Sequence, residues 1–438
     1  MTKVLVVGSG AREHAIAWLL KSSQTEVELV CFASNHNPGL VELTTDLKLG
    51  QMDDVLAVTD FAKQHQVDFA VIGPELPLSV GVVEALAESG IPAVGPTQAL
   101  AQIESSKSFT RDLLSEFEIE ANPKYKEFTE FSEVEAWVKD NAASGFVIKP
   151  DGLTGGKGVK VQGDHFDTLE EGLKIVKNVI DSEGKVVVEE KLVGQEFSLM
   201  SFSDGENLLH MPPVQDHKRA FDGDKGPNTG GMGSYSYPNN LPFLSDDDIL
   251  QAQKINGQVV SALKKKLGEA YKGILYGNYI AVKDGLRLIE YNARLGDPEA
   301  MNALSLIEGD FVKLCQDIIN GSLDKSDINF KAEATVCKYI VPKGYPDNPV
   351  KNEKIDVSEV DQSKVKLFYA AVDAREDGLY LTGSRAIGVV ATANTVSEAE
   401  KIVESEIKKI TGPVFHRQDI GTKKLIDKRI NIMKEIRG

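Results

Sequence analysis

The first hundred residues alternate between short runs of β-branched, apolar residues and longer stretches with helical periodicity. The predicted strands are 4–7, 28–32, 69–72 and 91–94, and the predicted helices are 13–20, 55–65 and 80–88. Strands that alternate with helices form parallel sheets with both faces covered. We therefore expect an α/β fold whose N-terminal domain has a parallel, Rossmann-like sheet, with functional loops at the carboxyl ends of its strands.

From residue 105 onward the pattern changes to longer helices and paired strands. The predicted helices are 108–117, 246–267 and 311–320; the predicted strands are 146–149, 159–161 and 186–190, with a hairpin at 274–293 and a long loop region at 212–244. A composition shift near 322–329 marks a further boundary. We expect three domains: 1–104, a central α+β domain at 105–325 with a lid subdomain at about 120–192, and a C-terminal α/β domain at 326–438.

Composition and charge narrow the class of protein. Of the 438 residues 42% are hydrophobic, which supports packed cores and excludes a disordered chain. The 66 acidic residues outnumber the 49 basic ones, so the net charge is −17 and a nucleic-acid partner is not expected. Cys31, Cys315 and Cys337 lack metal-ligand spacing, and no apolar stretch approaches the ~20 residues that span a bilayer. We expect a cytoplasmic protein with no membrane contact and no obligate protein partner.

The loop after the first predicted strand suits an anion. Gly8-Ser9-Gly10 follows a strand and precedes a helix, as in a dinucleotide fingerprint, but Glu13 replaces its third glycine and obstructs close helix–strand packing. Backbone N–H groups at the helix start still favour a phosphate. The loop therefore favours a small phosphorylated substrate over NAD, with a purely structural turn as the alternative.

A second glycine-rich stretch, 149–158, nearly matches a P-loop. However, Asp151 stands where the first glycine is required, Gly158 replaces the final Ser or Thr, and the residues after it predict a strand rather than a helix. The pattern therefore indicates a flap between two strands, whose glycines let the backbone approach phosphate oxygens while Lys149 and Lys157 supply positive charge. A flexible surface hairpin is the alternative.

The strand 288–294 alternates with period two. One face has Ile289, Tyr291 and Ala293, and the other has Glu290, Asn292 and Arg294. Carboxylate and amide oxygens are good Mg²⁺ ligands, and a guanidinium can stabilise a phosphoryl group during transfer. This face predicts a metal and phosphate site, with a solvent-exposed edge as the alternative.

The preceding strand adds a third oxygen ligand. A three-residue loop at 283–285, with Gly285 in the left-handed region, would place residue 282 opposite 286 and Asn278 opposite Glu290. A two-residue turn would instead turn Asn278 toward the core. The longer loop is favoured.

Two further runs have specific sequences, Gly-Pro-Asn-Thr-Gly-Gly-Met-Gly at 226–233 and Arg-Leu-Gly-Asp-Pro-Glu at 294–299. Together with the segments 6–14, 73–75, 106–107, 149–159 and 215–219, they make essentially the whole chain resemble an ATP-grasp enzyme. The resemblance is closest to the glycinamide ribonucleotide synthetase family of purine biosynthesis.

This resemblance implies ATP bound between two subdomains, with Mg²⁺ or Mn²⁺ as one or two ions. The implied ATP-binding residues are Lys107, Lys149, Gly152, Gly155, Gly156, Lys157, Gly158, Glu189, Glu190, Leu192 and Glu196. The strand from Glu189 to Leu192 would contact adenine, and Glu196 would bind the ribose. Asn278, Glu290 and Asn292 occupy the metal-ligand positions, and Arg294 and Lys149 are the implied catalytic residues.

The resemblance also implies glycine and 5-phosphoribosylamine as substrates. The implied substrate-binding residues are Gly8, Gly10, Arg12, Glu13, Glu75, Asp216, Lys218, Asn228, Gly230, Gly231 and Asp297. The glycine carboxylate would attack the γ-phosphate, and the amine would then displace phosphate from the glycyl phosphate. The alternatives are an ATP-grasp carboxylase, a nicotinamide oxidoreductase and a catalytically silent nucleotide-binding regulator.

Overall fold

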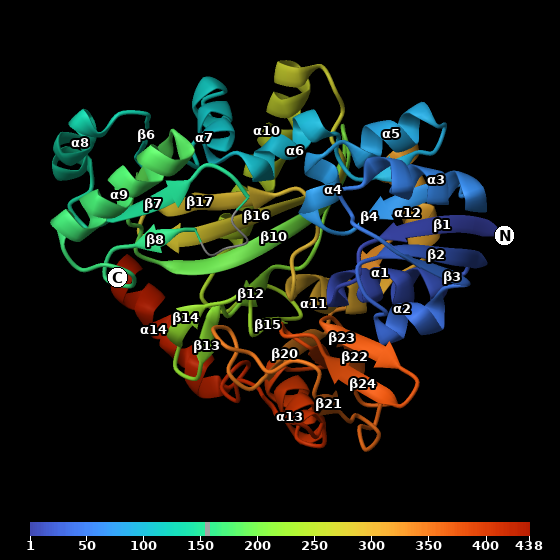
Figure 1. The fold of residues 1–438 in the computed structure, drawn as a ribbon. Coiled ribbons are helices and arrows are strands. Elements are labelled where there is room, and N and C mark those ends of the chain that lie inside the picture. Colours follow the sequence, from blue (N-terminus) through green and yellow to red (C-terminus); the bar gives the residue numbers. More distant parts are fainter. Residues whose placement is uncertain (154–157) are drawn as a thin grey trace.

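The computed structural model describes residues 1–153 and 158–438. Its N-terminal part is a parallel sheet in the order β3-β2-β1-β4-β5, coloured blue in Figure 1. The elements are β1 (Thr2–Val7), α1 (Ala11–Lys21), β2 (Val27–Ala33), α2 (Pro38–Leu43), β3 (Asp46–Leu49), α3 (Val55–His65), β4 (Phe69–Ile72), α4 (Glu75–Ser79), α5 (Val82–Glu88) and β5 (Ala93–Val94). The predicted parallel-sheet domain is confirmed, although the sequence pattern did not indicate β3, α2 and α4.

Both faces of this sheet are covered because alternate residues of β1 enter different cores. Leu5 and Val7 pack in a core that also contains side chains of α3 and α5. Val4 and Val6 belong to a second core, which contains side chains of α1. All four side chains are fully buried. After Val7 the chain leaves β1 at Gly8 (φ +124°), at the carboxyl edge of the sheet, where a substrate site is expected.

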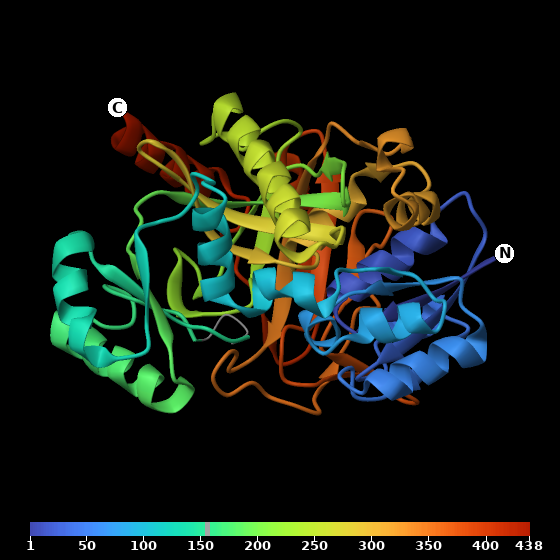
Figure 2. The ribbon, with the colours of Figure 1, turned by 90° about the horizontal axis from the view of Figure 1, so that it is seen from above.

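A small antiparallel sheet projects from the rest of the molecule (Figures 1 and 2). Its order is β6-β9-β7-β8, and its elements are β6 (Tyr125–Phe128), α8 (Val134–Asn141), β7 (Phe146–Pro150), β8 (Lys160–Val161), α9 (Leu169–Glu183) and β9 (Val186–Glu190). Phe146, Val176 and Val188 belong to a core of its own. Gly172 of α9 lies against the Phe146 ring, where a larger side chain would overlap it.

The large sheet has ten strands, eight of them in the order β17-β16-β10-β12-β15-β20-β25-β22, with β11 beside β10 and β26 beside β20. These strands are β10 (Gln195–Asp204), β11 (Leu208–His210), β12 (Val214–Asp216), β15 (Gly233–Ser236), β16 (Lys272–Val282), β17 (Gly285–Asn292), β20 (Ala334–Pro342), β22 (Lys366–Tyr369), β25 (Ile387–Ala393) and β26 (Val414–Phe415). Strands from the last hundred residues therefore continue the central sheet through the β15–β20 pairing.

Helices and short strands surround these sheets. They are α6 (Gln98–Ser105), α7 (Lys107–Glu116), α10 (Asp246–Leu267), α11 (Glu299–Ser305), α12 (Phe311–Asn320), α13 (Val396–Ile407) and α14 (Lys423–Arg437), with β13 (Arg219–Phe221), β14 (Lys225–Asn228), β18 (Ile307–Glu308), β19 (Asn329–Phe330), β21 (Lys354–Ile355), β23 (Val372–Arg375) and β24 (Gly378–Leu381). A capping box of Ser245 and Asp248 begins α10 at the predicted residue. Within the described ranges, no helix is long and apolar enough to cross a membrane.

The turn between β16 and β17 differs from the prediction. Val282 pairs with Gly285, so the loop has two residues rather than three, and residue 282 does not face 286. Gly285 does have a positive φ, at +96°. The predicted three-residue turn is therefore wrong.

A β-bulge nevertheless produces the predicted ligand pair. Tyr279 lies opposite Leu288, but Asn278 lies opposite Glu290, so Ile289 has no partner on β16. The extra residue restores the register that the shorter turn would have lost. It also leaves Ile289 half-exposed, contrary to the prediction that it faces the core, while Tyr291 remains buried.

Candidate active site

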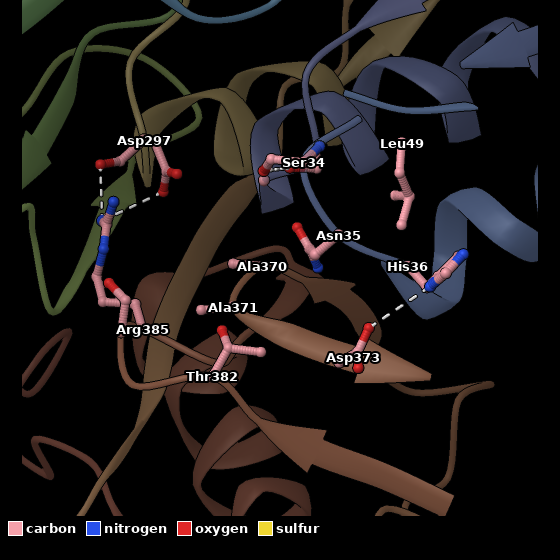
Figure 3. A pocket seen from close by; sticks show the side chains of 13 residues that line it. Ser34, Asn35, His36, Leu49, Asp297, Ala370, Ala371, Asp373, Thr382 and Arg385 are labelled. Atoms are coloured by element: carbon pink, nitrogen blue, oxygen red, sulfur yellow. Dashed lines mark hydrogen bonds and ion pairs between the residues drawn. The ribbon is translucent and has the colours of Figure 1, made fainter. Parts of the chain in front are cut away.

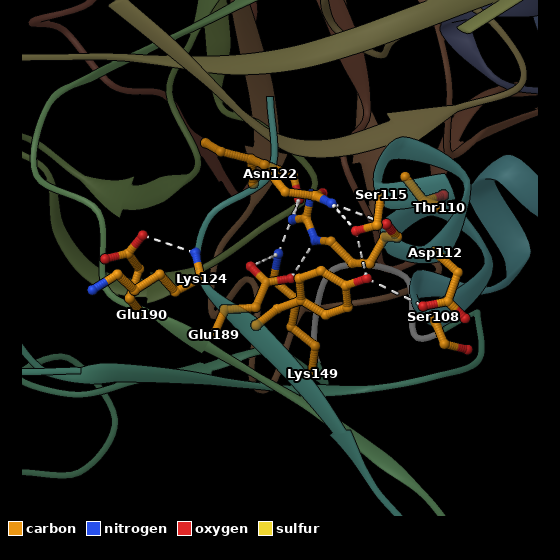
Figure 4. Close-up of polar contacts among 12 residues, drawn as sticks. Ser108, Thr110, Asp112, Ser115, Asn122, Lys124, Lys149, Glu189 and Glu190 are labelled. Carbon is orange, nitrogen blue, oxygen red and sulfur yellow. Dashed lines mark hydrogen bonds and ion pairs between the residues drawn. The ribbon is translucent and has the colours of Figure 1, made fainter. Parts of the chain in front are cut away.

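The small and large sheets meet at a buried group of charges. Lys149 on β7 and Glu189 on β9 are 4% and 3% exposed, and Arg111 on α7 is 2% exposed. Lys149 Nζ lies 2.8 Å from Glu189 Oε2, and Arg111 Nε lies 2.7 Å from Oε1. Figure 4 shows Glu189 and Lys149 directed toward each other, beside Asn122.

This surrounding changes the ionisation of both partners. Burial lowers the pKa of Lys149, an effect that Glu189 opposes. Burial would raise the pKa of Glu189, but Arg111 and Lys149 outweigh it and hold that pKa below its usual value. Glu189 is therefore a carboxylate that fixes the Lys149 ammonium.

The start of the flap is tied to α7. Asp151 accepts a hydrogen bond from the Ser108 N–H at 2.7 Å and forms an ion pair with Lys185 at 2.7 Å. Lys107 Nζ donates to the Gly152 carbonyl at 2.5 Å. Of the flap residues predicted to bind ATP, Gly152 and Gly158 are described, whereas Gly155, Gly156 and Lys157 lie outside the described residues.

The segment 191–194 connects β9 of the small sheet to β10 of the large one. The Glu190 carboxylate, at the end of β9, accepts a hydrogen bond from the Lys124 N–H at 2.8 Å. Leu192 is half-buried in this connection. Glu196, on β10, forms an ion pair with Lys218 at 3.2 Å. The residues predicted to contact adenine and ribose thus lie at the end of β9, at the start of β10 and in the connection between these two strands.

The predicted metal ligands lie side by side on β16 and β17. Asn278 is opposite Glu290, and Asn292 follows two residues further along the same strand. When the Asn278 amide is oriented to satisfy its neighbours, its oxygen accepts from Lys218 Nζ at 2.9 Å and its nitrogen donates to the Phe197 carbonyl at 3.3 Å. Among the described residues, no three His, Cys, Asp or Glu side chains form a metal-binding group.

The charges around these ligands favour a divalent cation. Burial, together with the neighbouring carboxylates Glu299, Glu196 and Glu290, raises the pKa of Asp216 to about 7, although Lys218 opposes this. Such a concentration of carboxylates is stabilised by added positive charge. One carboxylate with two amide oxygens is also a hard, all-oxygen donor set. The residues present therefore fit a divalent metal ion that prefers oxygen ligands.

Arg294, two residues after the end of β17, connects that strand to the N-terminal part of the chain. Its guanidinium lies 3.2 Å from Glu75, at the start of α4, and 3.0 Å from Glu104 on α6. Burial opposes ionisation of Glu75, but Arg294 and Arg12 lower its pKa to about 2. Burial raises the pKa of Glu104 despite Arg294. Arg294 is thus held between two acids that lie far from it in sequence.

Glu13 occupies the crevice at the N-terminus of α1. Its carboxylate accepts from the Gly10 N–H at 2.6 Å and pairs with Arg12 Nε at 2.5 Å. A Cβ on Gly8 would lie 2.7 Å from the Glu13 carboxyl carbon, and one on Gly73 would overlap the same side chain. An internal carboxylate therefore already accepts the Gly10 N–H at the start of α1.

A cavity of about 690 Å³ opens beside Gly10. It is lined by Ser9, Gly10, Ser34, Asn35, His36, Leu49, Asp297, Ala370, Ala371, Asp373, Thr382, Ser384 and Arg385. Figure 3 shows Asp297 with Arg385 on one side, and His36 with Asp373 on another. The cavity thus lies between the N-terminal loops, the segment after β17 and the C-terminal part of the chain.

Arg385 fixes the glycine-rich run beside this cavity. It donates to the carbonyls of Gly230 and Gly231 at 2.8 and 3.1 Å, and it lies 3.2 Å from the Asp297 carboxylate. Asn228 ends β14, and the Thr229 N–H after it donates to the Lys218 carbonyl at 2.7 Å. The structure therefore brings together three of the five segments that were predicted to bind substrate, namely 216–218, 228–231 and residue 297.

Three family models match the chain in order. The N domain, the ATP-grasp (A) domain and the C domain of phosphoribosylglycinamide synthetase match residues 2–104, 105–300 and 335–423. The phosphoribosylamine–glycine ligase of Methanocaldococcus jannaschii is 48% identical, covering 99% of this chain and 100% of that protein. This chain belongs to the phosphoribosylglycinamide synthetase family. Members of the wider ATP-grasp ligase family use ATP and a divalent metal ion.

Solved structures agree with this membership. The Thermotoga maritima phosphoribosylamine–glycine ligase superposes with a TM-score of 0.80 at 27% identity, covering 95% of this chain and 100% of that one. A biotin carboxylase from Campylobacter jejuni reaches 0.74 at 13% identity, covering 99% and 95%. The second likeness concerns the fold alone.

The sequence did not predict three residues of the candidate site, Arg111, Glu104 and Arg385. Each is a charged residue that pairs with a predicted site residue from a distant segment. Arg111 lies one helical turn after Lys107, and this spacing is the one sequence signal that could have indicated it. Glu104 and Arg385 have no comparable signal.

Proposed function

We propose that this chain ligates glycine to 5-phosphoribosylamine, producing glycinamide ribonucleotide, ADP and phosphate for purine biosynthesis. The observation that carries the proposal is the place of Arg294. Arg294 lies two residues after Asn292, the last residue of the strand that contains Glu290, and it forms an ion pair with Glu75 at the start of α4. A phosphoryl group beside Glu290 and Asn292 and a substrate in the N-terminal crevice would therefore both contact the Arg294 guanidinium.

The first step transfers the γ-phosphoryl group. A glycine carboxylate oxygen attacks the γ-phosphorus of ATP, the bond to the β-phosphate oxygen breaks, and ADP leaves. Arg294 and Lys149 would stabilise the charge that spreads over the transferred oxygens, because positioning and charge neutralisation supply most of the catalysis in phosphoryl transfer. A divalent ion, Mg²⁺ or Mn²⁺, would supply further neutralisation of phosphate charge, held by Asn278, Glu290 and Asn292.

The second step forms the amide. The amine of 5-phosphoribosylamine attacks the carbonyl carbon of glycyl phosphate, the carbon–oxygen bond to phosphate breaks, and the amine loses a proton. We place 5-phosphoribosylamine in the cavity lined by Gly10 and Asp297. Arg12, Glu13 and Glu75 would orient the ribose or amine from the neighbouring crevice. Such orientation makes the attack effectively intramolecular.

We further propose that Lys107, the flap glycines and Lys157 contact ATP phosphates, and that residues 189–196 bind the nucleoside. Asp216, Lys218, Asn228, Gly230 and Gly231 would complete the substrate site.

The three cysteines are free thiols, which supports the expected cytoplasmic setting.

The test measures ADP release with ATP, Mg²⁺, glycine and freshly generated 5-phosphoribosylamine, omitting each in turn. Full turnover that needs both co-substrates, with glycinamide ribonucleotide as product, supports the proposal. Release that depends on bicarbonate and ignores glycine would instead indicate a carboxylase and contradict it.

A further inference from the structure

Arg111 connects three elements around the ATP side of the site. From α7 its guanidinium donates to Glu189 on β9 at 2.7 Å, to the Ile289 carbonyl on β17 at 2.7 Å and to Asn122 Oδ1 at 3.3 Å. The side chain is 2% exposed. A single buried guanidinium therefore fixes the small sheet, the large sheet and the segment before β6 relative to one another.

Arg111 and Lys149 share two acceptors. Each takes one oxygen of the Glu189 carboxylate, and each donates to the Ile289 carbonyl, Lys149 at 2.9 Å. Ile289 is the bulge residue without a partner on β16, and its carbonyl accepts hydrogen bonds from both cations. Without Arg111, one oxygen of Glu189 would lose its buried partner, and the carboxylate could turn away from Lys149.

We propose that Arg111 is a positioning residue for phosphoryl transfer. It orients the Glu189 carboxylate, and through this carboxylate it fixes the position of the Lys149 ammonium relative to β17, which contains Glu290 and Asn292. This inference rests on the proposed function, because it assumes that Lys149 meets the ATP phosphates. Arg111 itself contacts protein groups, so it acts through the groups that it orients, chiefly Glu189 and the Ile289 carbonyl.

The experiment compares Arg111→Met, Glu189→Gln, the double variant and Arg111→Lys. Lys338→Met is the control for loss of a buried cation, because Lys338 is fully buried and paired with Glu400 and Glu404 away from this junction. For each protein the kcat, the KM values for ATP and glycine, the Kd of a non-hydrolysable ATP analogue and the melting temperature are measured.

We expect Arg111→Met and Glu189→Gln each to lower kcat/KM for ATP by at least about tenfold, because small displacements of catalytic groups are costly. The KM for glycine should change less than about threefold. The kcat/KM for ATP of the double variant should be no lower than that of the less active single variant, since one residue acts through the other. Arg111→Lys should recover part of the loss by reaching Glu189, and Lys338→Met should affect the melting temperature alone.

Two results would overturn the inference. One is ATP kinetics within about threefold of wild type in Arg111→Met, or in Glu189→Gln if the first variant does not fold. The other is multiplication of the two single effects in the double variant. Failure of the proposed function gives a different result, because the wild type would then show no glycine-dependent turnover. The Kd of the ATP analogue, compared between wild type and Arg111→Met, would still report on the role of Arg111.

Discussion

At the scale of single residues, the charged groups expected at the site are held by other charged groups. Lys149 is fixed by Glu189, Arg294 by Glu75 and Glu104, and Asp297 by Arg385. Buried charges need such partners, because an unpaired charge away from water is costly. The pairs hold the side chains in place before any substrate binds, which reduces the ordering that the reaction requires.

Glu290→Gln should raise the Mg²⁺ or Mn²⁺ concentration that gives half-maximal activity by at least about tenfold, because it removes the carboxylate from the proposed ligand set. Binding of an ATP analogue should be partly retained. Titrating metal against activity measures the effect, with Asp284→Asn as control, since Asp284 is exposed at the turn of the same hairpin. An unchanged metal requirement in Glu290→Gln would mean that the ligand assignment is wrong.

The paired acids make stability depend on pH. The pKa of Glu75 is about 2 in the folded protein against an ordinary 4.5. The unfolded chain therefore binds a proton that the folded chain does not, and the stabilisation present above about pH 5 is lost as pH falls toward 2. Between pH 5 and pH 3 the urea midpoint of Glu75→Gln should fall less than that of wild type. Glu88→Gln, at an exposed position, should follow wild type; equal slopes in all three would refute this.

Residue types were more predictable than their partners. Alternation along 288–294 correctly separated Glu290 and Asn292 from the buried Tyr291, because a strand has a fixed period. The partners could not be predicted, because Arg111 and Glu189 are 78 residues apart and only the fold brings them together.

At the scale of elements, the β16–β17 hairpin shows how a correct pair can follow from a wrong turn. The prediction extended the register from the loop without interruption, but the bulge at Ile289 shifts it by one residue. A bulge leaves little signal in one sequence, because any apolar residue can occupy it. Here it also supplies the carbonyl that Lys149 and Arg111 share.

The small sheet should open independently of the large one, because it has a separate core. Phe146 is 1% exposed in that core and packs against Phe166. Phe146→Ala should destabilise the core by about 3–5 kcal/mol. Amide exchange should then accelerate across β6, β7 and β9 while β10 and β16 keep their protection. Equal acceleration in both sheets would show that they unfold as one unit.

At the scale of the whole molecule, segments that lie far apart in the sequence meet around the cavity. The strand and helix pattern predicted the N-terminal sheet, since its signals are local. The continuation of the central sheet by β20, β25 and β22, and the approach of Arg385 to Gly230, depend on pairings between distant segments. Local periodicity gives no information on such pairings.

Gly10→Val should separate the two halves of the site. A Cβ on Gly10 would lie 2.9 Å from Glu13 Oε2 and 4.0 Å from Asp297 Oδ2, so the larger side chain would enter the cavity. The KM for 5-phosphoribosylamine should rise at least about tenfold while ATP binding stays near wild type. Measuring both in the same variant decides the point, because a collapse of ATP binding with unchanged amine saturation would reverse the proposed division of the site.

The central claim is that ATP activates the glycine carboxylate before the amine attacks. Glycine labelled with ¹⁸O in its carboxylate tests this most directly, with mass spectrometry of the phosphate and the ligated product. If glycyl phosphate forms, one glycine oxygen leaves in inorganic phosphate and the other remains in the amide carbonyl. We predict one ¹⁸O atom in each phosphate released. Unlabelled phosphate, formed during turnover that still depends on glycine, would contradict the account.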